Sequence, residues 1–349
     1  MVTEQQIRDA LTHVMDPEIN RNVIELNMLR DLRIDGDNVE FTLALTIPDC
    51  PLRDQIQQNA RLAVLALDGV KNVKVNLGAM SEEERNQILG KTSKPQASDF
   101  NHIGRTVAIA SGKGGVGKSS VTALLAVGLA KLGYKVGVLD ADVTGPSIPR
   151  LFGLHEPPLG GTLGILPPQT MRGIKVMSVN LLLPREDEAV IWRGPIVSKV
   201  IEQFWNEVVW GELDYLLIDL PPGTSDAPLT VMQSLPVAGI ILVTTPQELS
   251  SMVVRKAKRM ADQLNRPILG VIENMSVFVC PVCGTRHELF GPSHVEEVAD
   301  APLLGRLAID PQLSAMEDAG AIEVYDSEET KNLVKEFIKV VPPPRAVSQ

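Results

Sequence analysis

The sequence predicts an α/β protein, with a doubly wound and mostly parallel sheet preceded by a small α+β domain. Continuous apolar runs such as Tyr215–Leu220 and Gly239–Thr245 have the composition of parallel strands buried on both faces. Segments typical of strands and helices alternate through the same part of the chain, as doubly wound folds require. A glycine-rich loop at Gly112–Ser119 also joins an apolar strand to a helix.

The larger domain is expected to cover residues 105–349. Its predicted strands are Thr106–Ala110, Lys135–Asp140, Tyr215–Leu220, Gly239–Thr245 and Ile268–Asn274, and its predicted helices are Lys118–Leu132, Ser250–Leu264 and Ser327–Val340.

The smaller domain is expected to cover residues 1–80. A helix over Glu4–Met15 should end at Asp16-Pro17, because the residue before proline avoids helical geometry. A hairpin turning at residues 35–38, a helix and a last strand should follow. Their predicted bounds are Leu32–Ile34 and Val39–Thr46 for the hairpin, Pro51–Leu67 for the helix and Val70–Val75 for the strand. Residues 81–104 are polar without apolar periodicity, which indicates a linker.

Composition narrows the class of protein. Of 349 residues, 44% are hydrophobic and 22% charged, which is typical of a globular chain. A formal net charge of -10 argues against sequence-independent binding to nucleic acid phosphates, so no nucleic acid partner is expected. No apolar run approaches the roughly 18 residues of a membrane span, and the N-terminus is unlike a secretory signal. Three cysteines do not make a disulfide framework, so we expect a cytoplasmic protein without membrane contact.

The loop Gly112–Ser119 fits the pattern G-x-x-x-x-G-K-[ST], which binds a magnesium–nucleoside triphosphate, here expected to be ATP. Lys118 would reach the β- and γ-phosphates, and the Ser119 hydroxyl would ligate Mg²⁺. The backbone around the phosphates would come from Gly112, Gly114, Gly115, Val116, Gly117 and Ser120. The alternative is an ordinary glycine turn.

Three further residues are candidates for the same site. Asp219 closes an apolar strand, where it would hold Mg²⁺ through a water molecule. Asp142 follows the strand Lys135–Asp140, and Asp140 is its rival for either acidic role. Gly223 can offer its backbone N–H to the γ-phosphate. The loops Thr144–Pro149 and Pro221–Asp226 are therefore candidate switches, unless they are ordinary proline turns.

The stretch Lys113–Lys118 reads KGGVGK and resembles the deviant Walker A (SIMIBI-type) P-loop family, which includes MinD, ParA, the nitrogenase iron protein and the Mrp/ApbC proteins. The resemblance implies that Lys113 acts across a nucleotide-sandwich dimer and that Asp142 orients or activates the attacking water. Without it, Lys113 is either a solvated charge or a second cation aimed at phosphates.

Trp210–Asp226 resembles the signature stretch of the Mrp/ApbC (Nbp35-type) ATPases. The segments Leu139–Pro149 and Ile191–Pro195 resemble further motifs of that family, and the likeness extends from Arg105 to about Phe337. It implies that Asn274, in ENM, contacts adenine. The chain departs from the family where relatives often read I-P-x-D, because it has Leu307-Ala308-Ile309-Asp310.

Cys280 and Cys283 form a CxxC, which can bind one metal from a turn. Two thiolates are half of a tetrahedral set, and a homodimer would supply the four that a [4Fe–4S] cluster requires. The Mrp/ApbC resemblance implies such a labile bridging cluster. Three alternatives remain open: zinc held with His287 and His294, a thiol–disulfide redox pair, and two inert thiols.

The segments Asp16–Ile19 and Thr46–Pro51 resemble motifs of the MIP18-like family, which is tied to iron–sulfur assembly. Cys50 precedes a predicted helix, whose dipole would favour thiolate. It is either a transient cluster ligand or reactive thiol, or a small apolar residue beneath the helix.

These patterns together predict an ATP-hydrolysing carrier or scaffold for an iron–sulfur cluster. The expected partners are a second copy of the chain, apo acceptor proteins and assembly factors. Two other functions are weighed: a MinD- or ParA-like positioning ATPase and an iron-protein-like reductase. The predicted helix Ser327–Val340 mixes acids with lysines and is followed by three prolines, so we expect it to dock on the domain rather than on a membrane.

Overall fold

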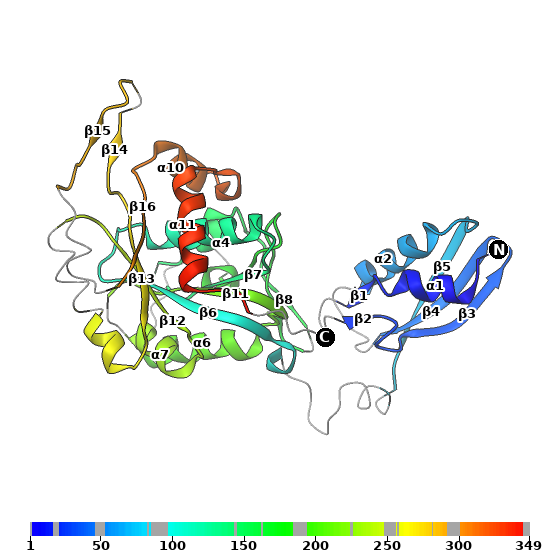
Figure 1. The fold of residues 1–349 in the computed structure, drawn as a ribbon. Coiled ribbons are helices and arrows are strands. Elements are labelled where there is room, and N and C mark those ends of the chain that lie inside the picture. Colours follow the sequence, from blue (N-terminus) through cyan, green and yellow to red (C-terminus); the bar gives the residue numbers. More distant parts are fainter. Residues whose placement is uncertain are drawn as a thin grey trace. The chain divides into compact units, whose positions relative to one another are not determined.

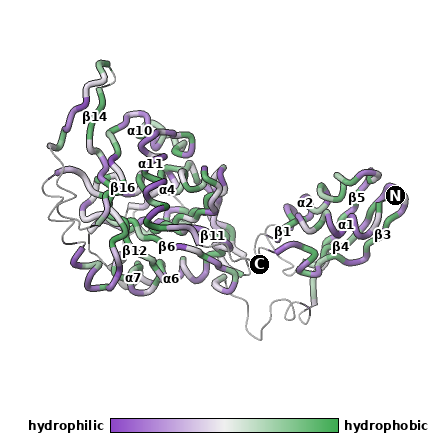
Figure 2. Tube along the Cα trace, viewed as in Figure 1, coloured by the Kyte–Doolittle hydropathy of each residue, from purple (hydrophilic) through white to green (hydrophobic). Residues whose placement is uncertain are grey.

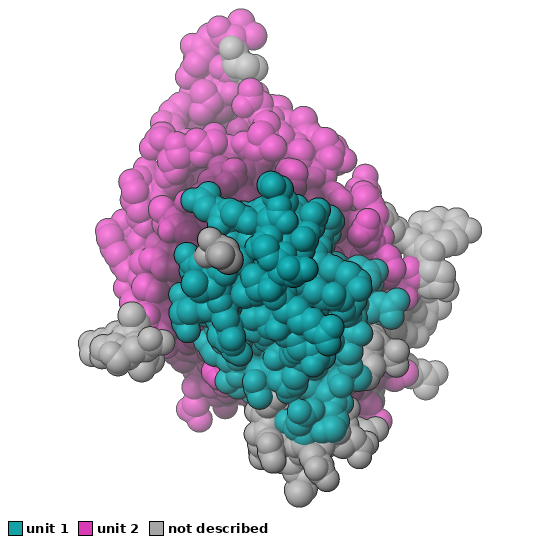
Figure 3. Space-filling model, turned by 90° about the vertical axis from the view of Figure 1, so that its right-hand side faces the viewer, with its two compact units in different colours: residues 1–101, 159–166 teal, residues 102–158, 167–349 magenta. Residues whose placement is uncertain are grey.

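The computed structural model describes residues 2–16, 21–45, 53–81, 84, 97–142, 145–161, 163–183, 194–223, 226–247, 256, 258–280, 282–291 and 301–344. The chain forms two compact units, which Figure 3 colours separately. The smaller unit comprises residues 1–101 and 159–166, and the larger comprises residues 102–158 and 167–349. The first strand of the larger unit begins at His102, within the segment expected as a linker.

The smaller unit packs two helices on a three-stranded sheet. Helix α1 (Glu4–Leu11) begins in a capping box, in which Thr3 and Gln6 each bind the other's backbone N–H. The sheet has the order β3-β4-β5, with β3 and β4 antiparallel and β4 and β5 parallel. The bounds are β3 Leu29–Asp35, β4 Asn38–Leu45, α2 Arg53–Leu65 and β5 Asn72–Ala79. The predicted hairpin and second helix are therefore confirmed.

The predicted end of the first helix is wrong. Helix α1 stops at Leu11, and Met15 instead belongs to strand β1 (Met15–Asp16), which pairs with β2 (Arg21–Asn22). The apolar side chains at Ile7 and Leu11 are buried, as the helical stripe requires, whereas Met15 is exposed. The helix therefore ends at Leu11, one turn earlier than the sequence pattern predicts.

A seven-stranded parallel sheet forms the centre of the larger unit, in the order β10-β7-β11-β6-β12-β13-β16. This confirms the doubly wound fold. The inner strands are buried on both faces and are strongly hydrophobic in Figure 2. The bounds are β6 His102–Ser111, β7 Val136–Asp140, β10 Lys175–Ser178, β11 Glu212–Asp219, β12 Gly239–Thr244, β13 Ile268–Glu273 and β16 Leu303–Arg306.

Helices cover both faces of this sheet (Figure 1). Helices α4 and α11 pack together on one face, and α6 and α7 pack together on the other. Because α4 lies between the sheet and α11, it is buried on most of its circumference. The bounds are α4 Lys118–Lys131, α5 Ile148–Leu151, α6 Gly194–Glu207, α7 Asp226–Ser234, α10 Pro311–Asp318 and α11 Glu328–Val340. The predicted helix Ser250–Leu264 lies partly outside the described residues.

Helix α11 docks on the body of the larger unit, as predicted. Ser327 caps its start by accepting the backbone N–H of Thr330. Leu333, Val334 and Phe337 are buried against α4 and the sheet. Among the described residues, no helix is both long and apolar enough to cross a bilayer.

The remaining elements are short. Strands β14 (Phe278–Val279) and β15 (Arg286–His287) form a hairpin that projects from the sheet in Figure 1. Strands β8 (Leu159–Gly160) and β9 (Ile165–Leu166) pair antiparallel. Single turns of 3₁₀-helix are η1 Ala97–Phe100, η2 Val179–Leu182 and η3 Ile322–Val324.

Candidate functional site: a phosphate loop and a cysteine hairpin

The glycine-rich loop joins the C-terminal end of β6 to the N-terminus of α4. Gly115 and Gly117 have φ angles of 74° and 76°, in the left-handed region that glycine adopts without strain. Gly117 is the N-cap of α4 and has no side chain to cap the helix. The first backbone N–H groups of α4 therefore face the loop, as anion-binding helix termini do. This geometry fits a phosphate group.

Asp219, at the end of β11, is fully buried and is held by three side chains. Lys118 Nζ lies 2.7 Å from Asp219 Oδ2 in a buried ion pair. The Ser119 hydroxyl donates to the same oxygen at 2.6 Å. The Thr122 hydroxyl donates to the other oxygen, Oδ1, at 2.7 Å. The sequence motif thus brings Lys118, Ser119 and Asp219 together, and a hydroxyl beside a carboxylate is the oxygen donor set that Mg²⁺ prefers.

Asp140, at the end of β7, is buried beside this cluster. It accepts hydrogen bonds from the Ser178 hydroxyl at 3.1 Å and from the Asp142 backbone N–H at 3.2 Å. Burial and the nearby charge of Asp219 raise the pKa of Asp140 to about 8. In the chain without bound magnesium or nucleotide, burial therefore favours the protonated form of Asp140. Asp142 is half-buried and accepts the backbone N–H of Gly145 at 3.1 Å.

Two residues expected to contact phosphate, Lys113 and Gly223, form hydrogen bonds with other residues of the chain. The Lys113 ammonium donates to Gln247 Oε1, on the loop after β12. The Gly223 backbone N–H donates to the Ser111 carbonyl at 2.9 Å, although it was expected to face the phosphates. In this conformation the segment after β11 is therefore tied to the start of the phosphate loop.

Asn274 follows β13 and also binds the phosphate loop. Its side-chain Nδ2 donates to the Val116 carbonyl at 2.9 Å, and its backbone N–H donates to the Thr244 carbonyl at 2.8 Å. The expected contact with adenine would have to share or replace the bond to Val116. Burial raises the pKa of the Glu317 carboxyl on α10, and the side chain of Ser120 opposes this rise.

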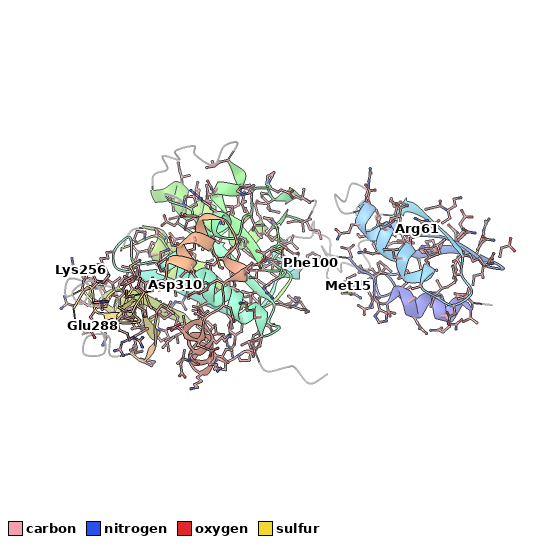
Figure 4. The ribbon with its side chains drawn as sticks, turned by 90° about the horizontal axis from the view of Figure 1, so that it is seen from above. Met15, Arg61, Phe100, Lys256, Glu288 and Asp310 are labelled. Carbon is pink, nitrogen blue, oxygen red and sulfur yellow. The ribbon has the colours of Figure 1, made fainter. Side chains whose placement is uncertain are left out.

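The segment that lacks the expected proline is hydrogen-bonded to residues on either side of Asn274, because the Leu307 N–H donates to the Glu273 carbonyl and the Ser276 N–H donates to the Leu307 carbonyl. The Asp310 carboxylate caps α10 by accepting the Gln312 backbone N–H at 2.8 Å, and Figure 4 labels Asp310 at this helix start. The Tyr325 hydroxyl donates to the same carboxylate at 2.7 Å.

The two cysteines lie in the turn between β14 and β15. The turn is closed by backbone bonds from Cys280 N–H to the Thr285 carbonyl and from Gly284 N–H to the Cys280 carbonyl, each 2.9 Å long. Cys280 is half-buried and Cys283 is exposed, and neither forms a disulfide. Hydrogen bonds with the side chain and backbone of Thr285 lower the pKa of the Cys283 thiol. A lowered thiol pKa favours the thiolate that ligates metals.

Within the described residues, no three His, Cys, Asp or Glu side chains gather into a metal site. His287 instead faces Phe278 across the hairpin, with ring centres 6.5 Å apart. His294 and Cys50 lie outside the described residues. Two thiols of one chain are therefore the donor set that the described hairpin offers.

Three residues near the site had not been predicted: Thr122, Ser178 and Gln247. Each touches a predicted residue that is distant in sequence. Thr122 carried the only local signal, since it lies one helical turn after Lys118 on the face toward the sheet.

Comparison with known proteins supports the assignment of both units. Residues 102–342 match the family model described as NUBPL iron-transfer P-loop NTPase, and residues 4–77 match the model described as iron-sulfur cluster assembly protein. The chain is 40% identical to an iron-sulfur cluster carrier protein of Synechocystis sp. over 95% of this chain and 94% of the relative. It is 47% identical to an iron-sulfur cluster carrier protein of Methanocaldococcus jannaschii over 73% of this chain and 91% of the relative.

Two solved structures of nucleotide-binding proteins are also similar to this chain. A nucleotide-binding protein of Archaeoglobus fulgidus, in complex with ADP and with cobalt found in it, is 49% identical, with a TM-score of 0.59 over 65% of this chain and 90% of that chain. The cell division ATPase MinD of Pyrococcus furiosus is 25% identical, with a TM-score of 0.52 over 68% of this chain and 99% of that chain. The chain belongs to the NUBPL iron-transfer P-loop NTPase family.

Proposed function

We propose that this protein is an ATP-dependent carrier that holds an iron–sulfur cluster between two copies of the chain and transfers it to apo-proteins. The observation that carries the proposal is that one unit contains both a phosphate loop, which follows β6, and a cysteine pair with an exposed Cys283, which follows β13 of the same parallel sheet. The names of the relatives, and the match of residues 4–77 to an assembly-protein model, support the same conclusion.

Nucleotide hydrolysis would rest on positioning and charge neutralisation. Lys118 and Lys113 would balance the phosphate charge, and Ser119 and Asp219 would hold the magnesium that accompanies ATP. The backbone around Gly112, Gly114, Gly115, Val116, Gly117 and Ser120 would enclose the phosphates.

The attacking water needs an acceptor within hydrogen-bond reach. The oxygens of Asp140 already accept hydrogen bonds from the Ser178 hydroxyl and from the backbone N–H groups of Asp142 and Ile148. Asp142 is half-buried and follows the same strand, which favours it over Asp140 for orienting the water. We assign Asp140 instead to holding the Asp142 backbone in place.

Triphosphate binding would have to break two bonds seen in this conformation. Lys113 would leave Gln247 to reach phosphate, and the Gly223 N–H would leave the Ser111 carbonyl to bind the γ-phosphate. Both changes would alter the surface around the loop, which makes them candidates for the switch that joins two subunits.

The cluster is cargo, bound by Cys280 and Cys283 of each copy. Two thiolates complete half of the four-cysteine set of a [4Fe–4S] cluster, so a second subunit would supply the rest. The exposure of Cys283 would let an acceptor's thiols reach the cluster. A carrier needs such access, whereas a structural metal site is usually closed.

The test is anaerobic reconstitution with iron and sulfide, followed by transfer to an apo ferredoxin. We expect a brown dimer with about four irons, lost in Cys280→Ala and in Cys283→Ala. Cys50→Ala is the matched control, because it removes the remaining cysteine and should leave the iron in place. One zinc per chain without iron absorbance would contradict the proposal. Iron that reduces an acceptor without leaving the protein would favour a reductase.

A further inference from the structure

The phosphate loop and the cysteine hairpin are connected by one short run of chain. Strand β13 ends at Glu273, Asn274 binds the phosphate loop, and β14 begins at Phe278, two residues before Cys280. Figure 1 shows β13 leading directly into the projecting β14–β15 hairpin. We infer that Asn274 is a positioning residue that couples occupancy of the phosphate loop to the conformation of the cysteine hairpin.

The first step is the contact at the loop. The Asn274 side chain is buried, and its Nδ2 donates to the Val116 carbonyl at 2.9 Å. Asn274 also approaches Gly117 so closely that a Cβ on Gly117 would lie 2.1 Å from Nδ2. Because the two surfaces touch without spare room, a change in the Val116–Gly117 backbone must displace the Asn274 side chain or break its bond.

The second step is the bend after Asn274. Met275 has a φ of 56°, in the left-handed region that an ordinary side chain rarely adopts. Such a residue persists only where its surroundings hold it, and here the Asn274 side chain and the Asn274 backbone bond to Thr244 lie immediately before it. The bend sets the direction in which the chain leaves the sheet.

The third step is the connection from the bend to the hairpin. The Ser276 backbone N–H and hydroxyl both donate to the Leu307 carbonyl, at 2.9 and 3.0 Å. The Ile309 N–H then donates to the Val277 carbonyl at 2.7 Å, and Phe278 pairs with Ile309 in a parallel bridge. These bonds join residues 276–278 to residues 307–309, so a change of direction at Met275 would move β14 and Cys280 together with that segment.

The inference rests on the proposed nucleotide-driven function, but its test needs neither iron nor hydrolysis. The rate of alkylation by iodoacetamide would be measured for the peptide that carries Cys280 and Cys283, with and without saturating Mg-ADP. For the wild-type chain we expect the nucleotide to change this rate about fivefold or more, the lower end of typical coupling between sites.

Asn274→Asp keeps the size of the side chain and removes its N–H donor. We expect the ratio of alkylation rates to fall to about one in this variant, with Mg-ADP raised until binding is saturated. Asn265→Asp is the matched control, because Asn265 is exposed, lies before the opposite end of β13 and also has a positive φ, of 51°. This control should keep the wild-type ratio.

Ser276→Ala provides a second variant if Asn274→Asp folds poorly. It removes the hydroxyl bond to Leu307 beyond the phosphate loop, so nucleotide affinity should stay unchanged while the ratio of rates falls. A wild-type ratio of one, or an unchanged ratio in both variants, would overturn the inference. A chain that binds no iron and still shows the nucleotide effect would refute the carrier function and leave the coupling intact.

Discussion

Asp219 is a buried carboxylate that the side chains of three neighbours contact. Lys118 and Ser119 contact Oδ2, and Thr122 alone of these donors contacts Oδ1. If magnesium and nucleotide draw Lys118 and Ser119 toward themselves, Thr122 remains to fix the orientation of the carboxylate. We therefore expect that a substitution of Thr122 reduces the rate of hydrolysis more than it reduces the affinity for nucleotide.

Thr122→Val removes this donor at nearly constant volume. A hydrogen bond to a charged group contributes about 1.5–3 kcal/mol, and each ~1.4 kcal/mol in the barrier changes a rate tenfold. We expect kcat for ATP hydrolysis to fall about tenfold or more. We also expect half-maximal activity to require a higher magnesium concentration. Steady-state kinetics across a magnesium titration would measure both effects. Thr122→Ser, which keeps the hydroxyl, should retain most activity, and equal rates in the two variants would argue against this role.

The protonation of Asp140 predicts a pH dependence of stability. The pKa of this carboxyl is about 8 in the folded chain, against an ordinary value of 3.8. Between these values the folded state binds more protons than the unfolded state, so this residue lowers the free energy of unfolding progressively as pH rises. The loss begins near pH 4 and is complete above about pH 8.

Asp140→Asn removes the titrating group and keeps a similar shape. Without nucleotide or magnesium, we expect the Tm of the variant to exceed that of the wild type by a margin that widens from pH 5 to pH 8 and then stays level. Thermal unfolding at several pH values would measure the margin. A margin that does not change with pH would show that Asp140 has an ordinary pKa in the folded chain.

At the scale of elements, local signals predicted the inner strands and the loop between β6 and α4. Apolar runs identify strands that are buried on both faces, and the phosphate motif places its residues within one strand–loop–helix unit. Strands β10 and β16 were missed because each is only a few residues long and forms an edge of the sheet. Their pairing depends on neighbours that are distant in sequence.

The same reasoning explains the residues missed in the site. Gln247 meets Lys113 across 134 positions of the chain, and Thr122 meets Asp219 across 97. A threonine or glutamine outside a known motif has many ordinary roles, so its place in the sequence does not indicate which residue it will contact. The bond between Asn274 and Val116 likewise depends on the sheet order, which brings β13 and β6 to either side of β12.

The contact between α4 and α11 gives a prediction for a pair of elements. A Cβ on Gly128 of α4 would lie 2.3 Å from Val334 Cγ2 of α11. Alanine favours a helix by about 1 kcal/mol over glycine, whereas overpacking costs about 1–3 kcal/mol. We expect Gly128→Ala to lower the free energy of unfolding by about 1 kcal/mol, measured by urea denaturation.

The double variant isolates this contact. Val334→Ala removes the methyl groups that a new Cβ would strike, so Gly128→Ala should become neutral or stabilising in that background. An equal loss in both backgrounds would place the cause outside the contact between α4 and α11.

At the scale of the whole molecule, each unit has its own buried core. Phe41, Ile56 and Leu43 are fully buried in the smaller unit, and Trp210 and Phe204 are fully buried in the larger. The smaller unit matches one family model and the larger unit another. Two cores of this kind can unfold as separate cooperative transitions, and only the larger unit contains the phosphate loop.

Calorimetry of the full chain should therefore resolve two transitions, of which Mg-ADP raises only one. At a ligand concentration 100 times Kd, binding adds about 2.7 kcal/mol of stability, which in a unit of this size corresponds to roughly 5–10 °C in Tm. Lys118→Ala provides the control, because it should abolish the shift and leave the other transition where it was. A single transition that moves as a whole with nucleotide would mean that the units unfold together. The smaller unit would then share in the energy of nucleotide binding, rather than serve as a separately folded module.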